Sequence, residues 1–340
     1  MNRTVILLLL FLGLGGLSGW YLLTREDEQR TLTGWDREFA VENTADIHKI
    51  FIVDRKGNRT TLERRTDYWL YNDKWKARPN AIENLLDAVG RLEMKYKPSQ
   101  AMVEHMIVDL ATNGIKVELY DAQESLLKAY YIGGSTVDER GTFIIRKGAE
   151  QPYVGHLPGW SGNLRYRFNL NGEDWRDRTV FSYQPEQIEL VTIEYPKQKS
   201  KSFRLRRRGE GFEVTPFYDI TPAKLEPTSQ GMVEVFLSGF ESLGAEAFEN
   251  KNPRRDSVIQ QLPFSIISVT NRQGETLSAS LFPLYPQRAL DPETGKVVGP
   301  DQVERYFAAL STGDFMLIQH RVFKKVLWAY DFFFKEEILQ

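Results

Sequence analysis

The chain has 340 residues, of which 41% are hydrophobic and 12% aromatic, and its formal net charge at pH 7 is −2. This composition is typical of a folded protein with apolar cores and excludes a disordered tether, while the near-neutral charge argues against nucleic acid as the main partner. Because the chain contains no cysteine, disulfide bonds and an N-terminal lipoprotein attachment are excluded.

The chain begins with an unbroken run of apolar or small residues from Val5 to Leu23. At about 1.5 Å per residue, a helix of this length spans roughly 28 Å, close to the hydrocarbon thickness of a bilayer. We therefore predict an N-terminal transmembrane anchor over residues 1–24 and a linker over residues 25–45. The alternative interpretation is a signal peptide that is cleaved at Gly16 to Ser18.

The orientation of this anchor depends on two opposing signals. Arg3 precedes the run, whereas Arg25, Arg30 and Arg37 follow it, so the positive-inside rule alone disfavours export of the body. A very short head followed at once by an apolar run is nevertheless typical of an export signal. We predict a single-pass protein of the cytoplasmic (inner) membrane, with its large C-terminal body in the periplasm.

Two stretches of the body resemble each other, which indicates an internal repeat. Each predicts a strand, a charged turn, a second strand that ends in an arginine pair, and a short third strand that carries an aromatic residue. The arginine pairs are Arg64-Arg65 and Arg207-Arg208, and the aromatic residues are Trp69 and Phe212. We predict two related tandem modules, over residues 46–181 and 186–340, joined by a short linker near 171–186.

Each copy continues with an amphipathic helix. The apolar positions are Ile82, Leu85, Leu86, Val89 and Leu92 in the first copy, and Met232, Val235, Phe236, Phe240 and Leu243 in the second. Spacings of three and four residues place each set on one helical face, and Asn80 with Glu83 resembles a capping box at the start of the first helix. A second, shorter helix is expected over residues 101–110 and again over 254–262.

A meander of strands is expected to follow the helices in each copy. The predicted strands are 115–120, 126–132, 142–146 and 153–156 in the first copy, and 264–270, 276–282, 315–320 and 326–330 in the second. The stretches GTFIIRKG from Gly141 and GDFMLIQH from Gly313 align the two copies. The predicted fold class is α+β, with each module a mostly antiparallel sheet that has its helices packed on one face.

No motif in the chain predicts a reaction. The four histidines lack the spacing of paired metal ligands, and Tyr131 to Ser135 lacks the Lys-Ser/Thr pair that follows a phosphate-binding loop. Gly133 and Gly134 instead predict a tight turn that closes a hairpin. We therefore predict no catalytic, cofactor-binding or metal-binding residues, and a protein that is not an enzyme.

The densest charge feature is a basic run over residues 197–208. Its members are Lys197, Lys199, Lys201, Arg204, Arg206, Arg207 and Arg208. Alternation puts the three lysines on one side of an extended segment, and it puts Arg204 and Arg206 opposite two apolar residues. This pattern favours a solvated edge strand. The functional alternative is contact with anionic headgroups or an acidic protein partner, through Lys197, Lys199, Lys201, Arg204 and Arg206.

The C-terminal stretch is unusually aromatic. Its apolar members are Val326, Leu327, Trp328, Tyr330, Phe332, Phe333 and Phe334. We predict that they close the core of the second module. The alternative is an exposed aromatic patch that docks to a membrane or a partner.

Several elements of the body together resemble a bacterial protein family. They are Trp69-Leu70, the helix from Ala81, Tyr131-Ile132-Gly133-Gly134, the strand from Gly141 to Lys147, and the segment Trp175 to Phe181. This order resembles the family catalogued as domain of unknown function 4340, over about Asp46 to Phe181 and more loosely in the second copy. The stretch from Gln100 to Leu110 departs from the family because it lacks the usual Tyr-Gly-Leu turn.

The resemblance implies a location and neighbours, but no activity. Family members are typically membrane-anchored envelope proteins, often encoded near transporters that resemble gliding-motility ABC systems. We therefore expect a non-catalytic accessory or scaffold component of a membrane transport (ABC-type) or gliding-motility-like assembly, with transporter subunits as partners and no cofactor. The alternative is a periplasmic ligand-binding protein or enzyme with its site in the cleft between the modules.

Overall fold

The computed structural model describes residues 38–285, 289–290, 297–298 and 302–334. The predicted anchor over residues 1–24 lies outside the described residues, and none of the described helices is long and apolar enough to cross a bilayer. The described residues up to Asp177 form one unit and those from Arg178 form a second, called unit 1 and unit 2 below. This border falls within residues 171–186.

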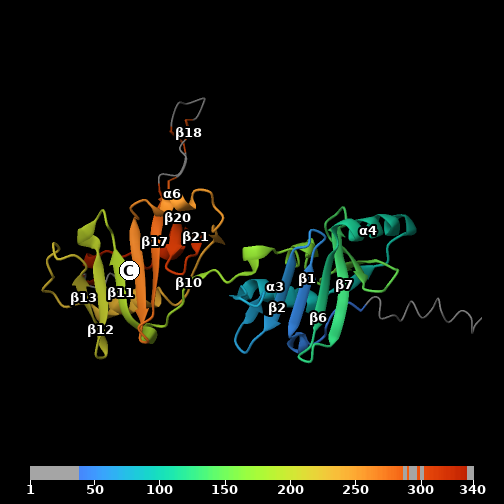
Figure 1. The fold of residues 1–340 in the computed structure, drawn as a ribbon, viewed down its shortest axis with the longest axis horizontal. Helices are drawn as coiled ribbons and strands as arrows, with labels where there is room; N and C mark the ends of the chain where they lie inside the picture. The colour runs from blue at the N-terminus through green and yellow to red at the C-terminus, as the bar shows by residue number, and fades with distance from the viewer. Residues whose placement is uncertain (1–37, 286–288, 291–296, 299–301, 335–340) are drawn as a thin grey trace, which may run out of the picture. The chain divides into compact units, whose positions relative to one another are not determined.

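Unit 1 is built on a nine-stranded antiparallel sheet with the order β4-β3-β2-β1-β6-β7-β8-β9-β5 (Figure 1). The strands are β1 (Lys49–Val53), β2 (Arg59–Arg64), β3 (Trp69–Tyr71), β4 (Trp75–Lys76), β5 (Glu93–Tyr96), β6 (Ile115–Tyr120), β7 (Leu126–Ser135), β8 (Thr142–Arg146) and β9 (Tyr153–His156). The helices are η2 (Thr44–Asp46), α3 (Pro79–Arg91), α4 (Gln100–Asn113), η3 (Leu164–Arg167) and η4 (Gly172–Trp175).

Unit 2 is built on an eight-stranded antiparallel sheet with the order β13-β12-β11-β16-β17-β20-β21-β15. The strands of this sheet are β11 (Ile188–Glu194), β12 (Phe203–Arg208), β13 (Gly211–Pro216), β15 (Ala247–Phe248), β16 (Ser265–Asn271), β17 (Thr276–Leu284), β20 (Arg305–Leu310) and β21 (Phe315–Gln319). Two small two-stranded sheets pair β10 (Thr179–Phe181) with β14 (Leu243–Gly244), and β18 (Ala289–Leu290) with β19 (Val297–Val298). The helices are η5 (Pro185–Gln187), η6 (Lys199–Lys201), α5 (Gln230–Ser238), α6 (Arg255–Ile259), α7 (His320–Phe323) and η7 (Tyr330–Phe334).

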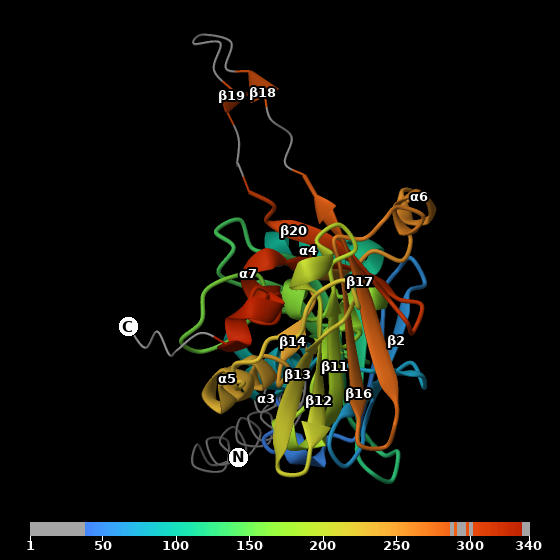
Figure 2. The ribbon, with the colours of Figure 1, turned by 90° about the vertical axis from the view of Figure 1, so that its left-hand side faces the viewer.

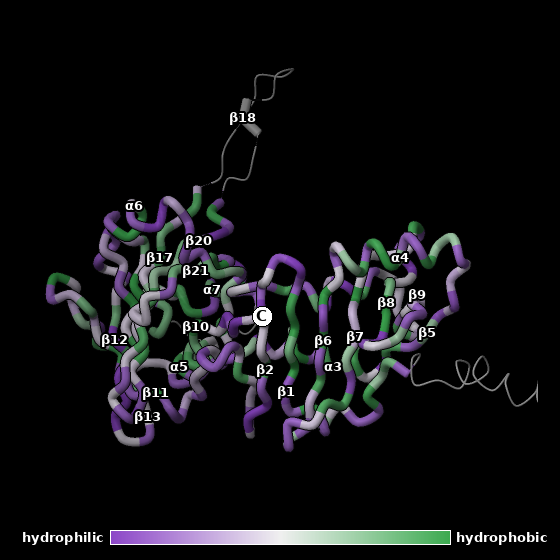
Figure 3. The backbone as a smooth tube through the Cα atoms, turned by 45° about the vertical axis from the view of Figure 1, so that its right-hand side comes forward, coloured by the Kyte–Doolittle hydropathy of each residue, from purple (hydrophilic) through white to green (hydrophobic). Residues whose placement is uncertain are grey.

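Buried and partly exposed positions alternate along many of these strands. In β1, for example, Ile50 and Ile52 are buried while their neighbours stay partly exposed, because successive side chains of a strand point to opposite faces of the sheet. Figure 3 shows hydrophobic and hydrophilic residues following one another along the strands of both units. The antiparallel, sheet-rich α+β class predicted from the sequence is thereby confirmed.

The prediction that the helices pack on one face of each sheet is wrong. In unit 1, α3 joins the large core, whereas Met106 and Leu110 of α4 pack with Phe143 and Val154 in a separate core. Phe143 and its neighbour Ile144 belong to different cores, so the two helices cover opposite faces. In unit 2, a small core on β17, β20 and β21 likewise includes Val258 of α6.

The glycine pair of unit 1 does not form the predicted turn. Gly133 and Gly134 lie within β7, and the backbone amide of Gly134 donates to the Asp109 carboxylate of α4 at 2.6 Å. A side chain at Gly133 would meet this carboxylate, because an ideal Cβ there lies 2.5 Å from Asp109 Oδ2. These glycines therefore serve the close approach of α4 to the sheet.

The end of unit 2 differs from the prediction in one strand. Residues 326–330 were predicted as a strand, but they form no strand and lead into η7, while β20, which the sequence analysis missed, supplies the strand between β17 and β21. The stretches from Gly141 and Gly313 therefore fall on β8 and β21, which hold different places in the two strand orders. The C-terminal aromatics do close the core as predicted, with Tyr330 and Phe333 buried in it.

One arginine in each unit ties the second strand to the start of the first. In unit 1, Arg64 Nε donates to the Ile47 carbonyl at 2.8 Å and Nη2 donates to the Thr44 carbonyl at 2.8 Å. Its guanidinium also lies 4.6 Å from the ring centre of Trp69, its partner across β2 and β3. These contacts join η2, β1, β2 and β3.

Arg207 makes the same set of contacts in unit 2. Its Nε donates to the Ile188 carbonyl at 2.9 Å, and Nη2 donates to the Pro185 carbonyl at 2.6 Å. Its guanidinium lies 4.4 Å from the ring centre of Phe212, which faces it across β12 and β13. These contacts join η5, β11, β12 and β13. We call Arg64 and Arg207, with these contacts, the arginine clamps.

A buried carboxylate organises the charged face of the unit 1 sheet. Glu118 of β6 accepts from Lys116 at 2.7 Å, Lys147 at 3.2 Å and the Tyr120 hydroxyl at 3.1 Å, and it is only 6% exposed. Burial opposes its ionisation, but the bonds from these three donors outweigh burial and lower the pKa of Glu118. The ionised form is therefore stabilised by folding.

We expect Glu118→Gln to lower the free energy of unfolding at pH 7 by about 1–2 kcal/mol, because charge-assisted hydrogen bonds are lost. A carboxylate with a lowered pKa stabilises the fold above its unfolded pKa, near 4.5, and this stabilisation is lost as the pH falls through the folded value. The difference between wild type and variant should therefore shrink in acid, as measured by urea denaturation from pH 7 to pH 3. Glu124→Gln, at an exposed pair with Lys49, is the control and should have almost no effect.

Candidate functional site

The structure divides the five predicted contact residues between a turn and a strand. Lys197, Lys199 and Lys201 are exposed in the connection from β11 to β12, whereas Arg204 and Arg206 lie on β12 itself. The extended conformation predicted for the lysines is wrong, because Lys199–Lys201 form the 3-10 helix η6. We call residues 197–201 the lysine turn.

The strand β12 alternates as the sequence predicted, but it is not an edge strand. Phe203 and Leu205 are fully buried, and Arg204 and Arg206 occupy the opposite face. The edge is β13, which pairs with β12 over its whole length (Figure 2). The arginines of β12 therefore lie on an interior strand of the sheet, where they cannot prevent another strand from pairing with its edge.

Two of the predicted cations are held over aromatic rings that follow β13. The Arg204 guanidinium lies 4.4 Å from the ring centre of Phe217, and Lys199 Nζ lies 5.1 Å from that of Tyr218. The Tyr218 hydroxyl donates to Glu194 at the end of β11. This bond to a carboxylate, together with burial, raises the pKa of Tyr218 to about 12. The lysine turn is thereby attached to the segment after β13.

One face of the unit 2 sheet stays open over four strands, β13, β12, β11 and β16. Its side chains, all partly or fully exposed, are Leu190, Thr192, Glu194, Arg204, Arg206, Arg208, Glu213, Thr215, Ile266, Ser268 and Thr270. We call this set the open face. Figure 2 shows the four strands side by side.

The open face combines two kinds of polar group. On β12 and β13, Arg208 pairs with Glu213 at 3.1 Å, and Arg206 faces Glu213 across the strands. On β16, the Ser268 hydroxyl bonds that of Ser278 at 2.7 Å, and Thr270 bonds Thr276 at 2.8 Å, both on β17. Short hydroxyl side chains on β16 therefore lie on the same face as the longer cations of β12.

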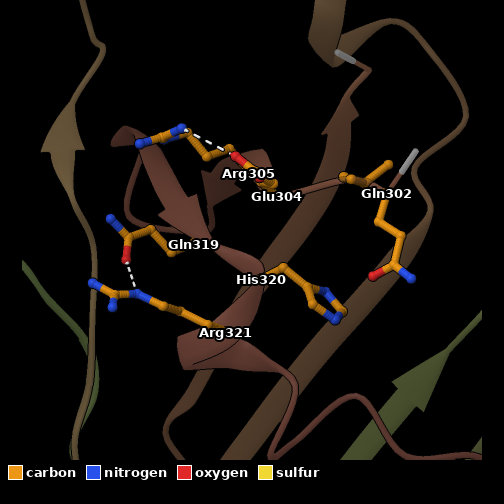
Figure 4. Close-up of a pocket in the computed structure, with 7 residues that line it drawn as sticks. Gln302, Glu304, Arg305, Gln319, His320 and Arg321 are labelled. Atoms are coloured by element: carbon orange, nitrogen blue, oxygen red, sulfur yellow. Dashed lines mark hydrogen bonds and ion pairs between the residues drawn. The ribbon is translucent and has the colours of Figure 1, made fainter. Parts of the chain in front are cut away.

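A cavity of about 440 Å³ lies beside β20 and β21 in the same unit (Figure 4). Glu246 accepts from Arg305 at 2.8 Å and Gln319 at 2.9 Å, and Gln319 in turn accepts from Arg321 at 2.7 Å. The bonds from Arg305 and Gln319 lower the pKa of Glu246. Figure 4 shows His320 directed away from Arg321, toward the wall on which Gln302 lies. Arg305, Gln319 and Arg321, which line the cavity, are therefore connected to one another through Glu246 and Gln319.

The sequence analysis missed two parts of this surface. Arg208 and Glu213 belong to the open face, and their alternation with buried Leu205 and Val214 was readable from the sequence. Leu225, which is exposed in the connection from β13 to α5, was not singled out either.

Comparison with known families decides the identity of the chain. A family model described as Domain of unknown function (DUF4340) matches residues 69–260, which is more than half of the chain. The chain belongs to the DUF4340 family. The resemblance seen in the sequence is confirmed, but the DUF4340 match begins later than expected, at β3, and extends through α6 of unit 2.

The DUF4340 match covers parts of both units, including the open face strands β11, β12 and β13 and the arginine clamp of Arg207. The clamp's aromatic partner in unit 1, Trp69, is the first residue matched. No match was found among curated proteins or among solved structures.

Proposed function

We propose that this DUF4340 protein is a non-catalytic, membrane-anchored envelope protein that serves as an accessory or scaffold component of a membrane transport (ABC-type) or gliding-motility-like assembly. Its anchor lies in the inner membrane and its body lies in the periplasm. Its partner is a membrane protein, such as a transporter subunit. The family resemblance and the apolar N-terminal run support this location.

The open face is the observation that carries the binding role. Arg206 and Arg208 are exposed on a broad antiparallel sheet, and arginine is among the residues enriched at protein interfaces. The neighbouring short hydroxyl side chains offer hydrogen bonds at a small cost in side-chain entropy. A partner with an acidic surface fits this combination of cations and hydroxyl groups.

The proposal predicts that charge reversal on the open face releases the partner. In a mild-detergent pull-down with the tagged full-length chain, Arg206→Glu/Arg208→Glu should reduce recovery of permease or ATPase subunits by about tenfold or more, because like charges across an interface repel. The variant should still fold, since Arg208 and Glu213 are both largely exposed and such pairs contribute little. Recovery is quantified by mass spectrometry.

The matched control is Lys56→Glu/Arg59→Glu, which makes the same charge change on exposed positions of unit 1 and should leave recovery unchanged. Equal losses in both variants would contradict the role of the open face. A full-length chain that recovers no membrane protein, and that is instead stabilised against heat by a specific small molecule, would overturn the accessory role in favour of ligand binding.

We also infer that the two units are diverged copies of one module. The order β3-β2-β1-β6-β7-β8-β9-β5 has the same sequence of connections as β13-β12-β11-β16-β17-β20-β21-β15. Both units have a 3-10 helix before the first strand, and both have an arginine clamp. The interval is 141 residues from Ile47 to Ile188 and 143 from Arg64 to Arg207, so the shared contacts support duplication.

A further inference from the structure

A loop after β13 presents two aliphatic side chains to solvent. In residues 217–228, which we call the apolar loop, Ile220 is 81% exposed and Leu225 is 99% exposed. Neither side chain is used in the core of unit 2, so both are available to contact another apolar medium.

The apolar loop is held in place at both ends. At its start, the Phe217 amide donates to the Ser202 carbonyl at 3.1 Å, directly after the lysine turn. Near its end, the Lys224 amide donates to the Tyr330 hydroxyl at 3.1 Å, and Lys224 Nζ pairs with Asp331 at 3.4 Å. These contacts connect the loop to η7, so Ile220 and Leu225 project from an anchored segment.

Prolines also limit how far this loop can collapse onto the core. Pro222 and Pro227 lie on either side of Leu225, and each fixes its own backbone angle φ. An anchored, proline-containing loop loses less conformational freedom on binding than a free one. The two exposed side chains are thus prepared for contact with another apolar medium.

The apolar loop and the lysine turn together carry more cations than acids. Lys197, Lys199 and Lys201 are exposed in the neighbouring lysine turn, and Lys199 lies on the Tyr218 ring. The loop itself contributes Asp219 and Glu226 as exposed acids. Lys224 is paired with Asp331, and Glu194 accepts from Tyr218. In these two segments, Lys197, Lys199 and Lys201 therefore outnumber Asp219 and Glu226.

We propose that the apolar loop and the lysine turn together form a docking surface for an anionic phospholipid bilayer. Ile220 and Leu225 enter the boundary between headgroups and acyl chains, while Lys197, Lys199 and Lys201 contact lipid phosphates. This inference rests on the proposed membrane location, because such a surface needs a bilayer within reach. It adds a second membrane contact to the predicted anchor.

The residue types favour lipid over a protein partner at this site. Protein hot spots are enriched in Trp, Tyr and Arg, whereas the projecting residues here are aliphatic and the cations of the neighbouring lysine turn are, by its sequence, all lysine. Lysine acts as a flexible point charge, which suits a fluid array of headgroups that offers no fixed geometry. The arginines, in contrast, lie on the open face that we assign to protein binding.

The absence of cysteine from the chain allows a direct test by labelling at single sites. The full-length protein carrying Leu225→Cys or Ile220→Cys is labelled with an environment-sensitive fluorophore and reconstituted into phosphatidylcholine vesicles with or without phosphatidylglycerol. We expect a blue shift, and quenching by spin-labelled lipid, that require phosphatidylglycerol. A label at Val137→Cys, fully exposed in unit 1, is the control and should report water in both vesicles.

Charge reversal separates lipid attraction from simple proximity. Lys197→Glu/Lys201→Glu should weaken the lipid-dependent quenching by about tenfold or more, since each lysine near an anionic surface contributes several-fold to binding, while Lys56→Glu/Arg59→Glu should leave it unchanged. Quenching that is equal in neutral vesicles would overturn the lipid proposal, and so would shielding of the label that appears only in a separate sample to which a membrane protein is added. The samples that contain lipid alone hold no partner protein, so their outcome is independent of the pull-down.

Discussion

Replacing Arg207 with alanine is expected to lower the free energy of unfolding of unit 2 by about 2–4 kcal/mol, because two charge-assisted hydrogen bonds and one cation–π contact are lost together. The carbonyls of Ile188 and Pro185 would each lose a donor. Urea denaturation followed by hydrogen exchange of peptides from β11 and β12 measures this loss in unit 2 alone.

The reason for a large effect is that Arg207 joins four elements at one point, η5, β11, β12 and β13. Lysine cannot replace it, since one ammonium does not reproduce two parallel donors and a planar stacking surface; Arg207→Lys should therefore recover less than half of the lost stability. The neighbouring Arg206→Ala is the control, because Arg206 is exposed on the open face. It should cost less than about 0.5 kcal/mol, as surface substitutions usually do.

The same substitution at Arg64 tests whether the clamp has one role in both units. Arg64→Ala should destabilise unit 1 to a similar extent, since its two bonds and its ring contact match those of Arg207. A loss of stability confined to one unit would argue against equivalent clamps, and it would weaken the inference that the units are copies.

The strands of the first hairpin in each unit could be predicted because their signal is local. Phe203 and Leu205 alternate with Arg204 and Arg206, and the aromatic partners Trp69 and Phe212 follow the arginine pairs at equal intervals. Such patterns need only the pleat of one strand and the turn beside it. The arginine pairs marked the repeat, although their inward contacts with carbonyls were not predicted.

Features that depend on distant segments were not predictable in the same way. An apolar stripe shows that a helix is buried on one side, but it does not show which face of the sheet it covers, as α4 demonstrates. In α5 the buried residues include Val233 and Leu237, while Val235 from the predicted stripe is 58% exposed. On a nine-residue helix, rotating the buried face by this amount leaves the spacing of the apolar residues almost unchanged. The sequence alone therefore does not show which of them are buried.

Two local signals were misread. Helix α3 begins at Pro79 with Arg78 as its N-cap, so the predicted capping box at Asn80 is wrong. Proline at the first helical position was the correct start signal. In the lysine turn, the alternating Lys residues suggested a strand, but the connection from β11 to β12 forms the 3-10 helix η6 instead. Charged residues at alternate positions do not by themselves distinguish a strand from a polar turn.

The predicted contact residues also differ in whether their placement could be predicted from the local sequence. Arg204 and Arg206 could be assigned to one face from alternation alone, whereas the attachment of the lysine turn to Phe217 and Tyr218 required the register of β12 with β13. Ile220 and Leu225 carry no pattern that distinguishes an exposed apolar side chain from a buried one. Their exposure follows from the anchoring of Lys224 to Tyr330, more than 100 residues further along the chain.

The largest single-residue effect on stability is expected at Phe236, in the centre of the aromatic core of unit 2. Its ring lies 5.4 Å from Phe203, 5.4 Å from Phe240, 5.2 Å from Phe333 and 5.4 Å from Trp328 between centroids. Phe236 is fully buried, so Phe236→Ala removes apolar contacts and leaves a cavity. We expect a loss of about 3–5 kcal/mol in the free energy of unfolding.

Trp328 provides the readout, because it is the only tryptophan in unit 2 and it packs on the substituted ring. Urea denaturation followed by its fluorescence should shift to lower urea without a change in slope; the signal of Trp328 is isolated by subtracting that of the same proteins carrying Trp328→Phe. Val235→Ala, one residue away on the exposed side of α5, is the matched control and should cost less than about 0.5 kcal/mol. Equal losses at the two positions would mean that α5 does not pack through Phe236, and that the aromatic C-terminal segment is held by other contacts.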